Sequence, residues 1–271
     1  ASKTYGDANP SLSATVSGFV NGQTLATSGV TGSGAATTAA TATTGAGSAT
    51  ITAGTGSLAA ANYDFTSLVD GTLTINKAHL TVTANNASKT YGDANPALST
   101  SVSGFVNNET LGTSGVTGSG AATTTATAST GAGTAVISAG AGTLTAANYD
   151  FTNLVNGALT INKAHLTVTA NNASKTYGDA NPALSASVTG FVNNETLGTS
   201  GVTGSGAATT TATATTGAGS ATITAGTGSL AAANYDFTSF VDGTLTINKA
   251  NATVTASSAN VTYTGLAQSV S

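Results

Sequence analysis

The hexapeptide Tyr-Gly-Asp-Ala-Asn-Pro occurs three times, beginning at Tyr5, Tyr91 and Tyr177, and this repetition decides the fold. The two steps are equal, because 91 − 5 and 177 − 91 are both 86. The tetrapeptides Asn-Tyr-Asp-Phe and Ile-Asn-Lys-Ala recur with the same step. Solenoid repeats typically span ~20–45 residues, whereas a repeat of this length suffices for a small domain with its own core. We therefore expect separate domains in tandem rather than a continuous solenoid.

The repeat motifs also set the expected boundaries. One further step from Tyr177 reaches Tyr263, so the tail is expected to start another, divergent copy, and the chain is expected to be part of a longer array. The expected modules are residues 1–77, which lack the first strand, 78–163 and 164–249, followed by the start of a fourth module at 250–271.

Within each copy the patterning predicts strands. In the third copy Leu166 and Val168 alternate with threonines, which is typical of a half-buried strand. We expect six or seven short strands per copy, with an exposed edge strand at 209–216, a hairpin turn at 241–244 and at most one helical turn at 194–197. The predicted class is mainly β, with β-grasp-like or β-sandwich-like modules arranged end to end as an elongated rod.

The predicted core of the third copy is thin, because alanine, serine and glycine fill much of the remainder. Its members are Leu166, Val168, Tyr177, Leu184, Val188, Phe191, Val192, Leu197, Val202, Ile223, Leu230, Tyr235, Phe237, Phe240, Leu245 and Ile247.

The junctions between copies are short and contain a lysine each, at Lys77, Lys163 and Lys249. Only the Asn-Lys-Ala tripeptide separates the predicted strands, and no glycine-serine linker or proline hinge is present. We expect semi-rigid connections. Lys89 and Lys175 lie across the junctions with Asp93 and Asp179. A junction salt bridge among these groups is a further candidate for fixing the angle, although exposed pairs contribute only about 0–1 kcal/mol.

Composition excludes several function classes. The 271 residues include no cysteine, methionine, tryptophan or arginine, only 6% are charged, and the formal net charge is −4. A disulfide framework and a thiolate metal site are therefore excluded, and no basic patch is present for nucleic acid. No apolar run approaches the ~18 residues of a membrane span, so no membrane insertion is expected.

Taken together, Lys-Thr-Tyr-Gly-Asp-Ala-Asn-Pro, Ala-Asn-Tyr-Asp-Phe and Gly-Thr-Leu-Thr-Ile-Asn-Lys-Ala resemble the MBG-type repeats of the YGX type. The resemblance extends to Lys249, and the tail resembles another MBG subtype. It implies a mostly β module that occurs in tandem in large secreted bacterial adhesins of the filamentous-haemagglutinin-like kind. It also implies an extracellular location at the bacterial surface and a stalk role, and it supplies no catalytic residues.

Each candidate site has a competing structural explanation. The turn motif offers calcium oxygens, but it gathers few carboxylates, and these residue types readily form turns. The calcium candidates are Asp93, Asn95, Asp179 and Asn181. The tyrosines of the two motifs are interpreted as structural: Tyr5, Tyr91, Tyr177, Tyr63, Tyr149 and Tyr235.

Other polar residues support no site either. The aspartates of the Asn-Tyr-Asp-Phe motif are interpreted as outward carboxylates, and the junction residues His79 and His165 as solvated. The Thr-Ala-Thr stretches at 41–43 and 211–213 are interpreted as exposed strand faces.

The first functional hypothesis is a structural stalk, with no enzymatic activity and no cofactor. Its expected partners are neighbouring modules and, through regions outside this sequence, a host or matrix surface. The alternative is a module that binds glycans or matrix weakly and gains avidity from repetition; it requires exposed aromatic faces, such as Tyr91 or Tyr177 beside an acidic groove. Self-association through uncharged edge strands is a third hypothesis.

Overall fold

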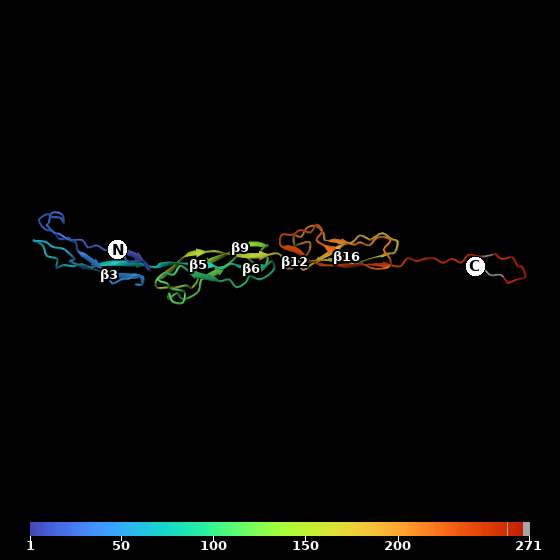
Figure 1. Cartoon of the computed structure of the whole chain (residues 1–271), viewed down its shortest axis with the longest axis horizontal. Coiled ribbons are helices and arrows are strands. Elements are labelled where there is room, and N and C mark those ends of the chain that lie inside the picture. The colour runs from blue at the N-terminus through green and yellow to red at the C-terminus, as the bar shows by residue number, and fades with distance from the viewer. Residues whose placement is uncertain (259, 268–271) are drawn as a thin grey trace. The chain divides into compact units, whose positions relative to one another are not determined.

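A computed structural model describes residues 1–258 and 260–267, and these residues form strands and loops (Figure 1). The mainly β prediction is confirmed. No described segment forms a helix that is long and apolar enough to cross a membrane. Two compact units, Ala1–Asn162 and Lys163–Ser271, are described in turn.

The first unit contains the first two copies of the repeat. The first copy supplies β1 (Ser2–Thr4), β2 (Ala35–Thr37), β3 (Gly47–Gly54) and β4 (Gly71–Asn76). The second copy supplies β5 (Ala78–Ala84), β6 (Ala87–Thr90), β7 (Thr100–Ser103), β8 (Ala121–Thr123), β9 (Gly133–Gly140), β10 (Tyr149–Val155) and β11 (Gly157–Asn162).

The second copy folds into two small sheets, in the strand orders β10-β5-β7 and β6-β11-β9-β8. Both sheets pair the beginning of the copy with its end, in parallel: β5 with β10, and β6 with β11. Fully buried side chains such as Leu80, Ile137 and Leu159 come from the alternating apolar positions of these strands. The first and last segments of the copy therefore lie side by side, with β7, β8 and β9 flanking them.

The second unit repeats this plan in the third copy. Its strands are β12 (Ala164–Ala170), β13 (Ala173–Thr176), β14 (Ala186–Thr189), β15 (Ala207–Thr209), β16 (Gly219–Gly226), β17 (Tyr235–Val241) and β18 (Gly243–Asn248). They form sheets in the orders β14-β12-β17 and β13-β18-β16-β15. The described residues that follow Asn248 carry no strand.

The first copy has one sheet, in the order β1-β4-β3-β2. Its residues 63–69, one period before β10, are not in a strand. The reason is that β10 pairs with β5, and no residue of the sequence stands one period before β5.

The predicted hairpin turn at 241–244 is wrong. Only Asp242 separates β17 from β18, and the two strands belong to different sheets. The chain passes from one sheet to the next instead of reversing. The Asp242 carboxylate accepts a hydrogen bond from the Ala225 amide at 2.8 Å, which fixes the residue between β17 and β18 to β16.

The threonine-rich segment also differs from expectation. The strand predicted at 209–216 ends at Thr209, and residues 214–216 form a turn. Residues 41–43 and 211–213 are outside strands, so they present neither a flat threonine array nor an exposed strand face. Threonine hydroxyls bond locally here: Thr210 donates to the Thr222 carbonyl at 2.7 Å. This local bonding competes with a strand ladder. At 194–197 the chain forms turns and no helix.

The predicted core is only partly correct. The structure buries seven of its members: Leu166, Val168, Ile223, Leu230, Tyr235, Leu245 and Ile247. Six are half-buried: Leu184, Val188, Phe191, Val192, Val202 and Phe237. Three are exposed: Tyr177, Leu197 and Phe240. Leu197 lies in a turn and Phe240 near the end of edge strand β17, where little chain is available to cover them.

Candidate junction site

The connection between the first two copies is shorter than the sequence suggested. β4 ends at Asn76 and β5 begins at Ala78, so Lys77 alone lies between them. The Asn76 carbonyl accepts the Tyr5 amide at 2.8 Å, and the Ala78 amide donates to the Asn148 carbonyl at 2.9 Å. Backbone hydrogen bonds thus hold the residue before Lys77 to the first copy and the residue after it to the second.

A glutamate joins two tyrosines across this junction. The Tyr5 hydroxyl, from the first copy, donates to Glu109 Oε1 at 2.6 Å. The Tyr149 hydroxyl, from the second copy, donates to Glu109 Oε2 at 2.6 Å. The two phenol rings meet edge to face, with centroids 5.5 Å apart and planes at 86°. Hydrogen bonds to an ionised acceptor are about twice as strong as neutral ones, so Glu109 connects the copies by charge-assisted bonds.

The turn that carries Glu109 is shaped for this contact. Asn107 and Asn108 have positive φ values of 55° and 59°, a region that asparagine tolerates better than most residues. The Glu109 amide donates to the Val106 carbonyl at 3.0 Å, which closes the turn. Val106 packs so tightly on Gly6 that a Cβ on this glycine would lie 2.6 Å from a Val106 methyl carbon. Gly6 is therefore required both by its φ of 94° and by the close approach of Val106 from the next copy.

Two asparagines add polar contacts across the junction. Asn107 Nδ2 donates to the Ala42 carbonyl at 3.2 Å, and Asn148 Oδ1 accepts the Ala46 amide at 3.0 Å. Apolar packing is also continuous, because Leu73 and Ile75 of the first copy share a buried cluster with Leu80 of the second.

The two junction phenols resist ionisation. Hydrogen bonding to Glu109, followed by burial, raises the pKa of Tyr5 above its ordinary value. Burial and the hydrogen bond to Glu109 raise the pKa of Tyr149 to about 12. Ionisation would remove the proton that each phenol donates to Glu109, and it would place a poorly solvated phenolate beside the carboxylate.

The sequence patterns assign no role to Glu109, and its counterpart Glu195 lies only in the helical turn predicted at 194–197. A signal was present: the chain has two glutamates, Glu109 and Glu195, one period apart, and the first copy has Gln23 at this position. In the third copy the Tyr235 hydroxyl donates to Glu195 Oε2 at 2.5 Å. In the first copy the Tyr63 hydroxyl donates to Gln23 Oε1. An amide has one acceptor oxygen, which suffices for one phenol, whereas Glu109 accepts from two.

The motif tyrosines differ in exposure. Tyr5 and Tyr91 are buried, and Tyr177 is 46% exposed. Tyr149 and Tyr235 are fully buried, and Tyr63 is half-buried against Phe19.

The junction lysines bond to backbone. Lys77 Nζ donates to the Ala146 carbonyl at 2.8 Å, and within the second unit Lys163 Nζ donates to the Ala232 carbonyl at 2.8 Å. Lys249 lines an open surface depression with Tyr177, Ala218 and Ala250.

Lys89 does not form the expected junction salt bridge. Lys89 is buried, and its ammonium donates to the carbonyls of Thr127 at 2.6 Å and Asp93 at 3.1 Å. The Asp93 carboxylate instead accepts the Thr90 amide at 3.3 Å, which is a turn contact. The lysine therefore fastens loops inside its own copy.

The calcium candidates lie in these turns. Asn95 and Asn181 donate their amides to the carbonyls of Ala126 and Ala212, each at 2.6 Å. The Asp179 amide donates to the Thr176 carbonyl, closing the turn at 3.1 Å. Among residues 1–258 and 260–267, no three His, Cys, Asp or Glu side chains gather as a metal site would require.

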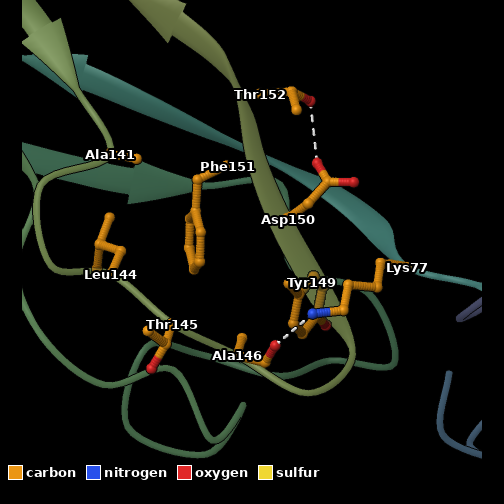
Figure 2. A pocket seen from close by; sticks show the side chains of 9 residues that line it. All are labelled: Lys77, Ala141, Leu144, Thr145, Ala146, Tyr149, Asp150, Phe151 and Thr152. Atoms are coloured by element: carbon orange, nitrogen blue, oxygen red, sulfur yellow. Dashed lines mark hydrogen bonds between the residues drawn. The ribbon is translucent and has the colours of Figure 1, made fainter.

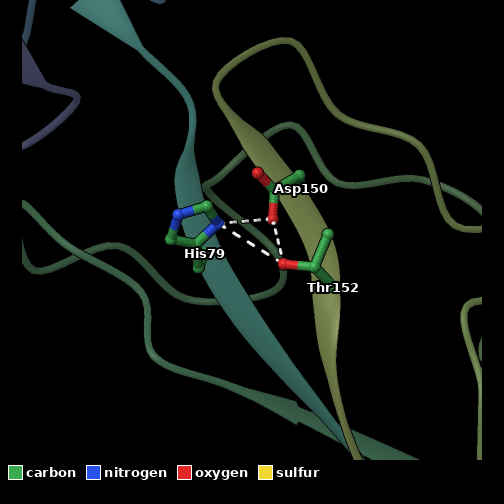
Figure 3. Close-up of polar contacts among 3 residues, drawn as sticks. All are labelled: His79, Asp150 and Thr152. Carbon is green, nitrogen blue, oxygen red and sulfur yellow. Dashed lines mark hydrogen bonds and ion pairs between the residues drawn. The ribbon is translucent and has the colours of Figure 1, made fainter.

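Two histidines are paired with carboxylates on the surface. His79 Nδ1 lies 2.7 Å from Asp150 Oδ1, and Thr152 donates to the same carboxylate at 2.9 Å (Figure 3). A register shift in β10 between Asp150 and Asn153 accompanies this arrangement. Burial opposes it, but hydrogen bonds from His79 and Thr152 lower the pKa of Asp150.

This triplet is not arranged as a nucleophile relay. The hydroxyl and the acid of such a relay contact opposite ring nitrogens, whereas Thr152 and Asp150 both approach Nδ1 of His79. His165 and Asp236 form the same pair at 2.6 Å in the third copy. The histidines, interpreted from sequence as solvated, are exposed but partnered.

An open depression lies next to the second copy's junction end (Figure 2). Its lining includes Lys77, Leu144, Tyr149 and Phe151. The Tyr149 hydroxyl is already bonded to Glu109, and the Lys77 ammonium to Ala146, so its main polar groups are engaged within the protein.

The family model described as MBG domain (YGX type) matches three stretches, residues 1–74, 80–160 and 166–246. The search of curated proteins returned no match.

Proposed function

Because the chain belongs to the MBG domain (YGX type) family, whose members are structural, non-enzymatic repeats typical of extracellular surface proteins, we propose that it is a spacer segment of a bacterial adhesin. In this role the chain projects a distal binding region from the cell surface and has no catalytic activity. The observation that carries the proposal is the junction of residues 1–162, where a single connecting residue is flanked by the Tyr5–Glu109–Tyr149 contact. A spacer needs a fixed angle between successive copies, and a hydrogen-bonded, apolar junction supplies it.

The alternative, weak glycan or matrix binding by every copy, requires an exposed aromatic face beside acidic groups. Tyr177 is exposed, but the depression that it lines contains Lys249 and no carboxylate. Tyr91 is buried, and the tyrosines of the Asn-Tyr-Asp-Phe motif in the complete copies, Tyr149 and Tyr235, are fully buried. These observations favour the spacer.

Small-angle X-ray scattering on chains with two, three and four copies tests the proposal. A spacer gives a maximum dimension that grows by a constant step for each added copy. A matched control carries a flexible glycine-serine insertion after Lys77, which should broaden the distance distribution without unfolding the copies. A dimension that grows as for a single compact globule, or an insertion without effect, would refute the spacer.

A further inference from the structure

We propose that each complete copy contains a shear clamp, defined as the parallel pairing of its first and last strand segments, which resists a force that pulls the ends of the copy apart. The inference rests on the proposed spacer role only for the direction of the force, which then acts along the chain. A spacer that holds distance need not resist pulling, so this is an additional property.

The pairing runs along the whole copy with a single register shift. In the second copy, partners differ by 71 at Ala78 and Tyr149, since 149 − 78 = 71. After the bulge the difference is 72, as for Thr81 and Asn153, and it stays at 72 through Thr90 and Asn162. Five partner pairs join β5 to β10 and four join β6 to β11. The two short pairings are thus two parts of one ladder.

Side chains complete the ladder where β5 gives way to β6. Asn86 Oδ1 accepts the Ala158 amide at 2.8 Å and so replaces a backbone acceptor in the gap. Gly157 lets the two segments approach closely, because a Cβ there would lie 2.4 Å from the Ala84 carbonyl oxygen. At the far end the Tyr91 amide donates to the Asn162 carbonyl at 2.8 Å.

The geometry determines how a force would act. The chain enters the copy at Ala78 and leaves it at Asn162, which lie at opposite ends of the ladder because the two segments are parallel. Pulling these ends apart slides one segment along the other. The hydrogen bonds of the nine partner pairs then share the force, whereas opening the ladder from one end would break them in succession.

The third copy has the same ladder. The difference is 71 at Ala164 and Tyr235 and 72 at Ala173 and Leu245. Asn172 Oδ1 accepts the Thr244 amide at 2.8 Å, in the place of Asn86. Two copies that differ in sequence therefore keep both the register and the side chain that completes it.

Single-molecule pulling with two attachment geometries tests the clamp in the full chain. The sequence has no cysteine, so pairs of exposed positions can carry unique handles. Asn76→Cys with Asn162→Cys pulls the ends of the ladder apart, whereas Ala94→Cys with Asn162→Cys opens it from one end. The first geometry is expected to need at least about threefold more force, because the bonds fail together. Equal forces, or the reverse order, would overturn the proposal.

A matched pair of proline variants tests the ladder itself. The Tyr91 amide faces β11, whereas the Thr90 amide faces Asp93, so the two-residue period turns Ala87 toward β11 and Ser88 toward the open edge. Ala87→Pro removes a ladder donor and should lower the end-to-end rupture force, and Ser88→Pro should leave it unchanged. If both variants changed the force equally, the clamp would be refuted. The two-geometry comparison needs neither variant, so it stands if Ala87→Pro does not fold.

Discussion

Tyr5→Phe removes one hydroxyl from the junction and keeps the ring, so it isolates the hydrogen bond to Glu109 from the edge-to-face packing on Tyr149. A hydrogen bond to a charged group contributes about 1.5–3 kcal/mol. Glu109 is half-buried, so the lower end of that range applies. Since about 1.4 kcal/mol is a factor of ten in an equilibrium constant, junction opening should become about tenfold more frequent.

Hydrogen-exchange mass spectrometry on the full chain measures that opening. The Ala46 amide donates to Asn148 Oδ1 across the junction, so its exchange reports separation of the first two copies. In Tyr5→Phe the peptide that contains Ala46 should exchange about tenfold faster, while peptides of β9 stay protected.

The chain offers a matched control for this prediction. Tyr177 occupies the same place in the third copy, where its amide donates to the Asn248 carbonyl at 2.8 Å as Tyr5 does to Asn76. Its side chain is 46% exposed, so Tyr177→Phe should leave exchange unchanged. If the two variants behaved alike, the hydroxyl of Tyr5 would contribute nothing and the reasoning on the junction would be refuted.

Three further predictions concern the ladder and the titratable groups. Gly157→Ala should lower the melting temperature, at a cost of about 1–3 kcal/mol, whereas Gly71→Ala, whose Cβ would meet only Ile51 at 3.6 Å, should not. The pKa of Tyr149 is raised to about 12, so the stability that its protonated form contributes is complete below pH ~10 and is lost as pH rises toward 12. Phenolate absorbance and denaturant midpoints at each pH measure this loss. An ordinary tyrosine pKa would contradict the prediction. The pKa of Asp150 is lowered, so the stability that its ionised form contributes is present above the ordinary aspartate pKa and is lost as pH falls through the pKa of the folded protein. His79→Asn should raise the pKa of Asp150 in an NMR titration, and an unchanged pKa would contradict the pairing.

The sequence predicts the local β pattern well because burial in a strand follows a period of two. Leu166 and Val168, chosen for their alternation with threonines, are fully buried in β12. Where the prediction failed, a contact distant in sequence decides the outcome. The residues from Val241 to Gly243 suggest a hairpin, but β17 and β18 each pair in parallel with a strand about 72 residues earlier. Because of this pairing the chain continues in the same direction from β17 to β18.

The candidate site was less predictable for the same reason. Glu109 contacts Tyr5, which is 104 residues away, and no local pattern encodes that distance. Comparison of the copies would have indicated it, because a glutamine replaces the glutamate in the first copy, where one phenol instead of two donates to the side chain. The repeat therefore contained the information, but in the differences between copies and not in their common motif.

The clamp and the junction contact meet at one residue but resist different deformations. The Tyr5 amide closes the end of the ladder on Asn76, and its hydroxyl reaches the next copy at Glu109. A pulling force between positions 76 and 162 reaches the ladder of the second copy through Lys77, and the nine partner pairs of the ladder fail at a higher force than a single phenol contact. Bending at the junction separates Tyr5 from Glu109 and leaves the ladder intact. It follows that Tyr5→Phe should not change the rupture force between positions 76 and 162, and that Ala87→Pro should not change exchange at Ala46. If either variant affected both measurements, the two features would form a single cooperative element, and separate roles for clamp and junction would be wrong.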